Sequence, residues 1–401
     1  MLHASRPAKT VTTNNTTVEQ FLAGIPVPVE PAAIERELAA LWKPASEQAS
    51  AGAGAAVTRV CLANLLVVGD AVNNAWHADT LQKLSARFPC RVLWVQLDSA
   101  SGDAGLSADV TALCHLPSPG NPQVCSELIT LHTGRGGAGG VPGAVRPLLE
   151  PDVPVVLWWA MAADAEMELF DALCALADRV VVHAEPLASP ALRTTSAAPS
   201  LRLCLRERAA GKATVMVWHA MCHWREMTAQ FFDPPPLRDA LRGIETVKVH
   251  YATPDGGPTA TLPAALLAGW LAGQLQWTPA ARKTVPGGVH AEFTDPASRA
   301  VSVELLAQAE NKVAPGRLML VDITAASGSA RASFHLARVV GERSEIRQTL
   351  CLSEACTLLK SLPIAERDEA TLLGAAIESQ SAACVFPRAA KTALWLLGGG
   401  N

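Results

Sequence analysis

The chain of 401 residues is nearly half apolar (49%) and carries a formal net charge of −4. This length predicts two domains, and the aliphatic share is ample for two cores. The weakly acidic balance argues against a nucleic-acid-binding protein, which normally presents a basic surface. We expect no membrane association, because the most apolar stretch, Leu262 to Trp277, is shorter than the roughly 20 residues of a spanning helix. The N-terminus lacks the apolar segment of a secretory signal, so we expect a cytoplasmic protein.

The first half of the sequence alternates strands and helices. Residues 1–28, rich in Thr, Asn, Pro and Ala, predict a flexible tail, and a helical repeat of apolar residues follows from Pro31 to Trp42. Apolar runs then predict strands at 59–68, 91–97, 110–116, 123–132, 153–159 and 179–183, with helices at 71–87 and 165–177. Two of these strands follow each other without a helix, which indicates a mixed sheet. We therefore predict an α/β domain over 29–188, a layered mixed sheet with flanking helices.

The second half is less regular. Helical patterns occur at 186–210, 222–231, 235–242 and 262–276, and several short β-type runs follow between 289 and 352. Two helices and an apolar segment, 392–397, end the chain. Clustered strands of this kind predict an α+β domain with an antiparallel sheet over 189–401.

The ten cysteines are spread singly, without a CxxC pair. Several lie inside apolar runs, which is typical of buried free thiols rather than of a disulfide framework. Cys351 and Cys356 are the closest pair that the sequence offers, and we interpret them as two structural thiols.

A glycine-rich segment, GRGGAGG, occupies residues 134–140. It is not a P-loop, because no Lys-Ser/Thr follows it, and its glycines do not fit the dinucleotide-binding pattern. A flexible surface loop is the favoured interpretation. Approach of its backbone amides to a phosphate remains an alternative.

A second motif, WHAMCHWRE, occupies residues 218–226. On a helix, His219 and His223 share a face, with Cys222 beside them. Ala220 stands where an HExxH motif requires Glu, and no third ligand is evident, so we expect no metal. No spacing selects a nucleophile with its base either, so we expect a protein that is not an enzyme and has no cofactor.

Tryptophan is unusually abundant, with ten Trp against one Tyr. Trp and Arg are enriched in binding hot spots, although Trp also fills domain interfaces. Arg91 and Arg225 are suited to pairing with carboxylates or phosphate, and Arg225 alternatively forms an internal salt bridge with Asp178 or Asp233. Glu127, in an apolar strand, is either inward and paired or on the solvent face. The candidate residues for binding a partner or ligand are Arg91, Glu127, Trp158, Trp159, Trp218, Trp224, Arg225 and Asp233.

Six segments together resemble the OpcA family of glucose-6-phosphate dehydrogenase assembly proteins. They are RFPCRVLWV (87–95), CSELITLH (125–132), VRPLLEPDVPVVLWW (145–159), LADRVVVHAEP (176–186), WREMTAQFFDPP (224–235) and ALLAGWLAGQLQW (265–277). The resemblance covers roughly residues 57–280. It implies a non-catalytic protein that binds glucose-6-phosphate dehydrogenase, favours its active oligomer and raises its affinity for substrate in the oxidative pentose phosphate pathway.

The chain departs from the family pattern at a few positions. Met216 and Ala220 stand where the family usually has Asp and Arg, and His183-Ala184 replaces a common Asp-Ser pair. Two other functions therefore remain open. One is a sugar-phosphate-binding enzyme or sensor of α/β type, and the other is a structural subunit without effect on the rate of the dehydrogenase.

Overall fold

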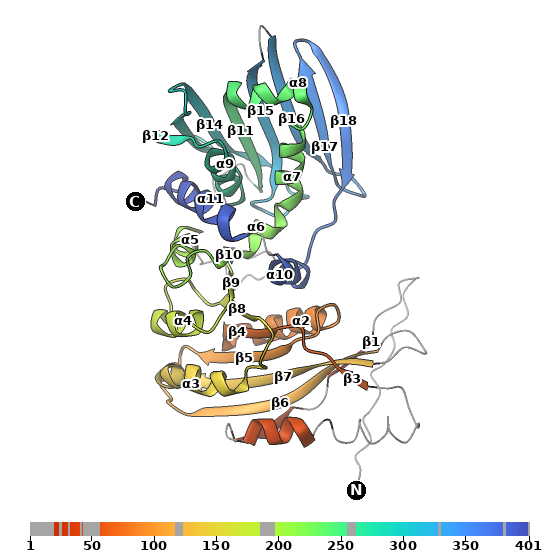
Figure 1. The fold of residues 1–401 in the computed structure, drawn as a ribbon, viewed down its shortest axis with the longest axis vertical. Helices are drawn as coiled ribbons and strands as arrows, with labels where there is room; N and C mark the ends of the chain where they lie inside the picture. The colour runs from red at the N-terminus through yellow and green to blue at the C-terminus, as the bar shows by residue number, and fades with distance from the viewer. Residues whose placement is uncertain are drawn as a thin grey trace.

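The structure is a computed structural model. It describes residues 20–23, 26–30, 33–40, 42, 57–116, 123–184, 197–254, 262–327, 330–379 and 382–399. Two mixed sheets with flanking helices lie one above the other, the first in the lower half of Figure 1 and the second in the upper half. The predicted α/β domain followed by an α+β domain is thereby confirmed.

The first sheet combines a parallel centre with an antiparallel edge. Its order is β1 (Gln20–Ala23), β6 (Leu106–Leu116), β7 (Gln123–Gly134), β5 (Arg91–Asp98), β4 (Asn64–Asp70), β8 (Val155–Ala160), β9 (Arg179–Val182) and β10 (Ala213–Val215). Two further strands, β2 (Val27–Val29) and β3 (Val57–Arg59), pair with β6 and β7. The strands from β7 to β10 are parallel, whereas β6 and β1 are antiparallel. Across the sheet the six parallel strands stand in the order β7, β5, β4, β8, β9 and β10. Numbered by their succession along the chain, this is the order 3-2-1-4-5-6, so the direction of winding reverses between β4 and β8.

Both faces of this sheet are covered, which explains why β8 is buried along its whole length. The helix α2 (Asn74–Ser85) packs on one face, and α3 (Val141–Val145) and α4 (Met167–Cys174) contribute to the core on the other. The helix α10 (Glu369–Glu378), from near the end of the chain, joins α2 on the first of these faces. Figure 1 shows α10 at the junction of the two halves. The C-terminal part of the chain therefore returns to the first sheet.

The second sheet is almost wholly antiparallel. Its order is β12 (Thr278–Val285), β13 (Gly288–Thr294), β14 (Ala300–Ala309), β11 (Ile244–Thr253), β15 (Leu318–Ser327), β16 (Ala330–Val339), β17 (Glu345–Leu352) and β18 (Ala355–Pro363). Only β11 and β14 run parallel among its described pairs. The helices α7 (Cys222–Gln230), α9 (Leu262–Gln274) and α11 (Ala382–Leu396) lie along one face (Figure 1). Further helices are α5 (Ala197–Cys204), α6 (Met216–Ala220) and α8 (Pro235–Arg238).

Several boundaries differ from the prediction. The strand expected at 59–68 is interrupted and forms β3 and β4, and the apolar segment 392–397 continues α11. Residues 20–23 and 27–28 of the expected tail pair with β6, while residues 1–19 and 24–25 of the tail lie outside the described residues. The first sheet also includes β10, beyond the expected domain boundary at 188.

The glycine-rich segment is a packed 3-10 helix, η3 (Arg135–Gly140), not a flexible loop. A Cβ atom on Gly134 would lie 2.7 Å from the carbonyl oxygen of Asp103, and one on Gly136 would lie 2.5 Å from that of Gly102. The glycines therefore allow two backbone segments to approach closely, and Gly137 and Ala138 are buried.

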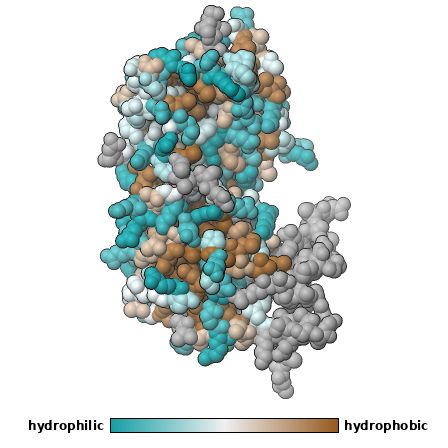
Figure 2. Space-filling model, viewed as in Figure 1, coloured by the Kyte–Doolittle hydropathy of each residue, from teal (hydrophilic) through white to brown (hydrophobic). Residues whose placement is uncertain are grey.

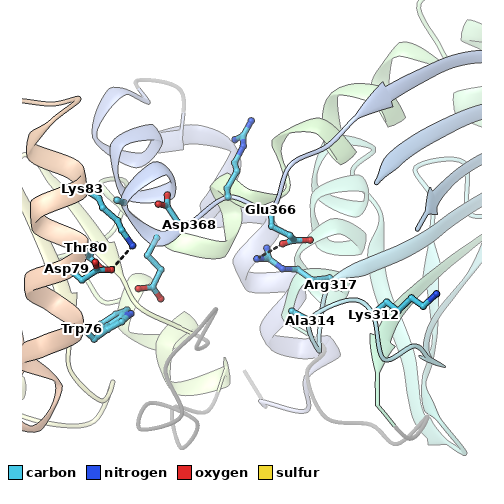
Figure 3. A pocket seen from close by; sticks show the side chains of 12 residues that line it. Trp76, Asp79, Thr80, Lys83, Lys312, Ala314, Arg317, Glu366 and Asp368 are labelled. Carbon is cyan, nitrogen blue, oxygen red and sulfur yellow. Dashed lines mark hydrogen bonds and ion pairs between the residues drawn. The ribbon is translucent and has the colours of Figure 1, made fainter. Parts of the chain in front are cut away.

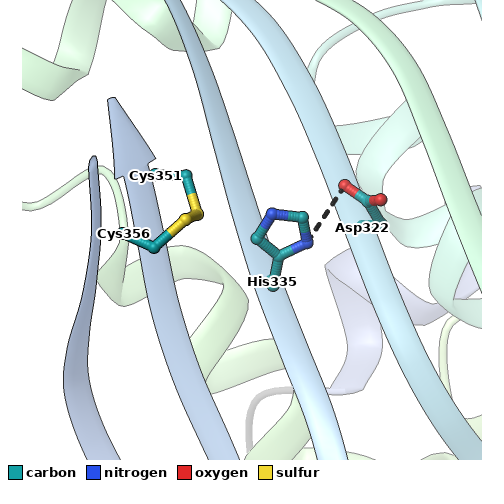
Figure 4. Close-up of a disulfide and its surroundings, with 4 residues drawn as sticks. All are labelled: Asp322, His335, Cys351 and Cys356. Atoms are coloured by element: carbon teal, nitrogen blue, oxygen red, sulfur yellow. Dashed lines mark ion pairs between the residues drawn. A yellow bond between two sulfur atoms is a disulfide. The ribbon is translucent and has the colours of Figure 1, made fainter. Parts of the chain in front are cut away.

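The prediction of two structural thiols at Cys351 and Cys356 is wrong. These residues face each other on β17 and β18 and form a disulfide with a Cα–Cα distance of 4.0 Å (Figure 4). The hairpin turn brings them together, which the sequence spacing alone did not indicate. Cys125 is also disulfide-bonded. The expectation of buried free thiols is confirmed for Cys90, Cys174 and Cys204.

The surface is mainly hydrophilic over both halves, with apolar side chains gathered over the middle of the lower half (Figure 2). Among the described residues, the large apolar side chains that are exposed are Val27, Leu62, Val72, Leu352, Leu358 and Leu359. Half of them lie on the last hairpin, β17–β18. No helix in the described part of the chain is long and apolar enough to cross a membrane, and the expected buried helix at 262–276 is α9.

Candidate functional site

Two of the candidate residues, Arg91 and Glu127, lie opposite each other on β5 and β7 and are buried. The Arg91 Nε donates to the Glu127 carboxylate at 2.7 Å, and the Trp42 indole donates to its other oxygen at 2.7 Å. A further Arg91 nitrogen donates to Glu35 at 2.8 Å and lies 3.2 Å from Glu150. For Glu127 the structure selects the inward, paired alternative. We name these five residues the Arg91 cluster, and its hydrogen bonds are satisfied within the chain.

Trp158 and Trp159 alternate across β8 and are both fully buried. Trp158 belongs to the core on the α2 side of the sheet, and Trp159 belongs to the core on the other side, where it packs on Phe170. Neither side chain has surface available to a partner in this conformation.

The motif at 218–226 forms the α6–α7 corner. Trp218 and Trp224 are buried at 4% exposure, and the Arg225 guanidinium stacks on Trp218 at 3.7 Å from the ring centre. Arg225 also donates to the Trp218 carbonyl at 2.6 Å, and burial lowers its pKa to about 10. In the described structure it pairs with neither Asp178 nor Asp233. Asp233 is exposed, and partner contact there stays a prediction.

The histidines of this motif do not converge on one point. His219 lies 3.2 Å from the Thr214 hydroxyl, and His223 lies 2.7 Å from an Arg367 nitrogen. Arg367 also donates to the Cys222 sulfur at 3.3 Å. No group of three or more metal-ligating side chains occurs in the part of the chain that is described.

A cluster that the sequence analysis did not select lies at the carboxyl ends of β4, β8 and β9. It consists of Trp76, His77, Trp94, Trp158 and His183, and we name it the Trp76 cluster. Trp76 contacts His77, Trp158 and His183 at 4.8, 5.7 and 5.3 Å between ring centres. Neither ring nitrogen of His77 or His183 has a hydrogen-bond partner, and burial lowers the pKa of each histidine to about 4.

Sheets of this strand order bind dinucleotides at the carboxyl ends of the strands where the winding reverses, here beside the end of β4. The turn after β4 reads Gly69-Asp70-Ala71-Val72, without the glycine repeat that admits a pyrophosphate. The His77 ring occupies the space beside Gly69, so that a Cβ atom there would collide with it. Side chains thus take the place of a dinucleotide cradle.

A pocket of about 400 Å³ lies between the two halves of the molecule, with Trp76 of the cluster on its wall. Figure 3 shows Trp76, Asp79, Thr80 and Lys83 of α2 on one side with Asp368 beside Lys83, and Lys312, Arg317 and Glu366 on the other. Ala314, Arg367, Glu369 and Ala370 complete the lining. The pocket joins α2 of the first sheet to the β14–β15 connection and to the chain that enters α10.

Two polar groups of this pocket are buried without a hydrogen-bond partner. Both carboxyl oxygens of Glu369 are unpartnered although the residue is only 5% exposed, and the Arg317 Nε is also unpartnered. Burial and the neighbouring Asp368 raise the pKa of Glu369 to about 8, while Lys83 opposes that shift. Buried groups of this kind are rare, because each costs about 1–3 kcal/mol.

Two domain models match most of the chain. Residues 81–197 match the glucose-6-phosphate dehydrogenase subunit N-terminal domain, and residues 212–390 match the corresponding C-terminal domain. The chain belongs to the OpcA family. This membership confirms the resemblance carried by the six segments above.

Curated relatives agree with this family. A putative OxPP cycle protein OpcA from Synechocystis sp. is 28% identical over 251 residues, which cover 60% of this chain and 50% of the relative. The corresponding protein from Nostoc punctiforme is 31% identical over 199 residues, covering 49% and 40%. The chain thus matches about half the length of these relatives.

Similarity to solved structures is distant. A 3-ketoreductase from Actinomadura kijaniata superimposes with a TM-score of 0.42 at 13% identity, covering 84% of this chain and 96% of the reductase. A biliverdin reductase from Synechocystis sp. has a TM-score of 0.40 at 11% identity, covering 84% and 97%.

Proposed function

We propose that the chain is a non-catalytic assembly factor and activator of glucose-6-phosphate dehydrogenase in the oxidative pentose phosphate pathway. The observation that carries the proposal is the match of two successive domain models of a dehydrogenase subunit over residues 81–197 and 212–390. The side chains that fill the turn after β4 and the ends of the neighbouring strands support a role without dinucleotide chemistry.

Activation requires only preferential binding. A protein that binds the active conformation of the dehydrogenase more tightly than the inactive one shifts the population toward the active state. A difference of about 1–3 kcal/mol in binding free energy corresponds to a change of roughly 5- to 150-fold in affinity.

The last hairpin is the surface that we assign to the dehydrogenase. Strand β18 is an edge strand, nearly all of its residues are exposed, and it carries Leu358 and Leu359 at 58% and 47% exposure. An exposed edge with apolar side chains favours pairing with another chain. Asp233 remains a second candidate contact.

The test is the rate of the dehydrogenase from the same organism against glucose 6-phosphate concentration, with and without this protein. A lower apparent KM or a higher kcat, together with a larger complex on a sizing column, supports the proposal. An unchanged rate together with a complex indicates a structural subunit, and the absence of both overturns the assembly function.

The contact surface is tested with Leu358→Asp combined with Leu359→Asp. We expect a loss of complex affinity of about tenfold or more, as for central apolar contacts. Lys283→Asp is the matched control, because Lys283 is exposed on β12 at the opposite edge of the same sheet. Equal effects of both variants would exclude β18 as the contact.

A further inference from the structure

The pocket between the two halves combines three kinds of binding group. Trp76 is partly exposed and offers an aromatic face, while the Glu369 carboxyl and the Arg317 Nε are buried without partners. Lys312 is exposed and forms no ion pair within the described residues. Ligand sites are typically concave spaces of 300–1,000 Å³ with a few convergent polar groups, and a pocket of about 400 Å³ is of this size.

The balance of charge in the pocket favours an anion. Its cationic side chains are Lys83, Lys312, Arg317 and Arg367, and its acidic side chains are Asp79, Glu366, Asp368 and Glu369. Glu369 is neutral at pH 7, since its pKa is about 8. Carboxylates at Asp79, Glu366 and Asp368 then face four cationic side chains. The Arg317 side chain is 14% exposed and pairs with Glu366 at 3.1 Å through one terminal nitrogen, while its Nε is buried without a partner.

The chemistry of these groups specifies the ligand further. A guanidinium presents a planar fork of donors that suits phosphate oxygens. A protonated carboxyl both donates and accepts, as a sugar hydroxyl requires. An aromatic ring packs against the apolar face of a sugar ring. We propose that this pocket binds a small phosphorylated sugar, with the phosphate on Arg317 and a hydroxyl on Glu369.

The position of the site gives it a consequence beyond binding. One wall belongs to α2 and the start of α10, which pack together on the first sheet, and the other belongs to the β14–β15 connection of the second domain. A ligand that contacts both walls stabilises one arrangement of the two halves. The inference goes beyond the proposed function, because it requires no dehydrogenase.

Isothermal titration calorimetry on the isolated full chain at pH 7 tests the site. Glucose 6-phosphate is the probe, and glucose and inorganic phosphate are the partial ligands. We expect saturable 1:1 binding of the sugar phosphate and affinities at least about tenfold weaker for each partial ligand, since each lacks one set of contacts. No binding of the sugar phosphate, or equal binding of inorganic phosphate, overturns the proposal.

Two pairs of variants locate the ligand. Arg317→Gln is expected to weaken binding about tenfold or more. Arg338→Gln is its matched control, because Arg338 also pairs with Glu366 at 3.1 Å but does not line this pocket, and it is expected to bind normally. Glu369→Leu is expected to weaken binding about fivefold, and Glu369→Gln to restore it.

Thermal unfolding of each variant confirms that it is folded before its affinity is compared. Normal binding by Arg317→Gln, or equal losses for Arg317→Gln and Arg338→Gln, would place the ligand elsewhere. Failure of the sugar-phosphate proposal is distinguishable from failure of the assembly function, because complex formation with the dehydrogenase is measured separately on the sizing column.

Discussion

Two buried polar clusters of the first domain differ in how they are satisfied. In the Arg91 cluster, the charges of Arg91 and Glu127 meet at 2.7 Å and additional hydrogen bonds complete both groups. In the Trp76 cluster, His77 and His183 have no hydrogen-bond partner at either ring nitrogen. The first arrangement supports the fold, whereas the second lowers stability by about 1–3 kcal/mol for each unpaired group.

This difference in hydrogen bonding indicates which of the two clusters lies near a functional site. A completed cluster explains its own presence, because removing Arg91 leaves the Glu127 carboxylate buried without its cation. Buried polar groups without partners are rare, so an incomplete cluster requires another reason, such as a functional one. The pocket between the two halves lies directly against the second cluster through Trp76.

The largest effect is expected for Arg91→Met. The substitution leaves the Glu127 carboxylate buried without its cation, so we expect a loss of about 3–5 kcal/mol in the free energy of unfolding, measured by urea denaturation. Arg36→Met is the control, because this side chain is 77% exposed and its change should stay within about 0.5 kcal/mol.

The double variant Arg91→Met with Glu127→Met sharpens this prediction. Replacing both charges by apolar side chains removes the unpaired carboxylate, so the double variant should be more stable than Arg91→Met alone. A double variant as unstable as the single one would contradict the assignment of the loss to an uncompensated charge.

The next effect concerns acid pH and the Trp76 cluster. The pKa of His77 and of His183 is about 4, below the ordinary 6.5, so the unfolded chain takes up these protons first. Stability should therefore fall as the pH drops from about 6.5 toward 4, by about 1.4 kcal/mol per pH unit for each ring. His183→Leu should make the melting temperature less dependent on pH over this range.

A histidine outside the cluster provides the comparison. His290→Gln replaces a histidine of the second sheet that lies outside the Trp76 cluster, with a side chain that is 21% exposed. Parallel profiles of melting temperature against pH for His183→Leu and the unmodified chain would show that these rings acquire partners in solution.

How much of the fold the sequence predicts depends on burial. The strand at Val155–Ala160 is a continuous apolar run and was predicted within about two residues, because both of its faces are covered. The strands β12 and β18 are almost wholly exposed and carry no alternating pattern, so they were missed. Strand β11 was missed although Val247, Val249 and Tyr251 alternate with more exposed residues, a pattern that predicts a strand.

The residues of the two polar sites also differ in how far the local sequence predicts their roles. Glu127 is a carboxylate within an apolar strand, and that local pattern already left an inward, paired position open. Glu369 gives no such indication, because its environment is created by α2, which lies nearly three hundred residues earlier in the chain. The Trp76-His77 pair after the first parallel strand was the available indication, since ligands bind at that end of such sheets.

The smallest effect is expected for Glu369→Gln, and it has the opposite dependence on pH. The pKa of Glu369 is about 8, above its ordinary 4.5, so the folded chain holds this proton more tightly than the unfolded chain. The contribution of the protonated carboxyl is complete below about pH 4.5 and is lost as the pH rises toward 8. Glutamine keeps the neutral form at every pH.

We therefore expect Glu369→Gln to match the unmodified chain in stability near pH 4.5 and to exceed it near pH 8, by at most about 3 kcal/mol. Asp368→Ala is the comparison, because Asp368 caps α10 by accepting from the Thr371 amide, and loss of the cap should destabilise the chain at both pH values. A gain for Glu369→Gln that did not grow with pH would indicate that Glu369 is ionised and paired in solution. The pocket would then resemble the Arg91 cluster, and the contrast between completed and incomplete polar groups would not extend to it.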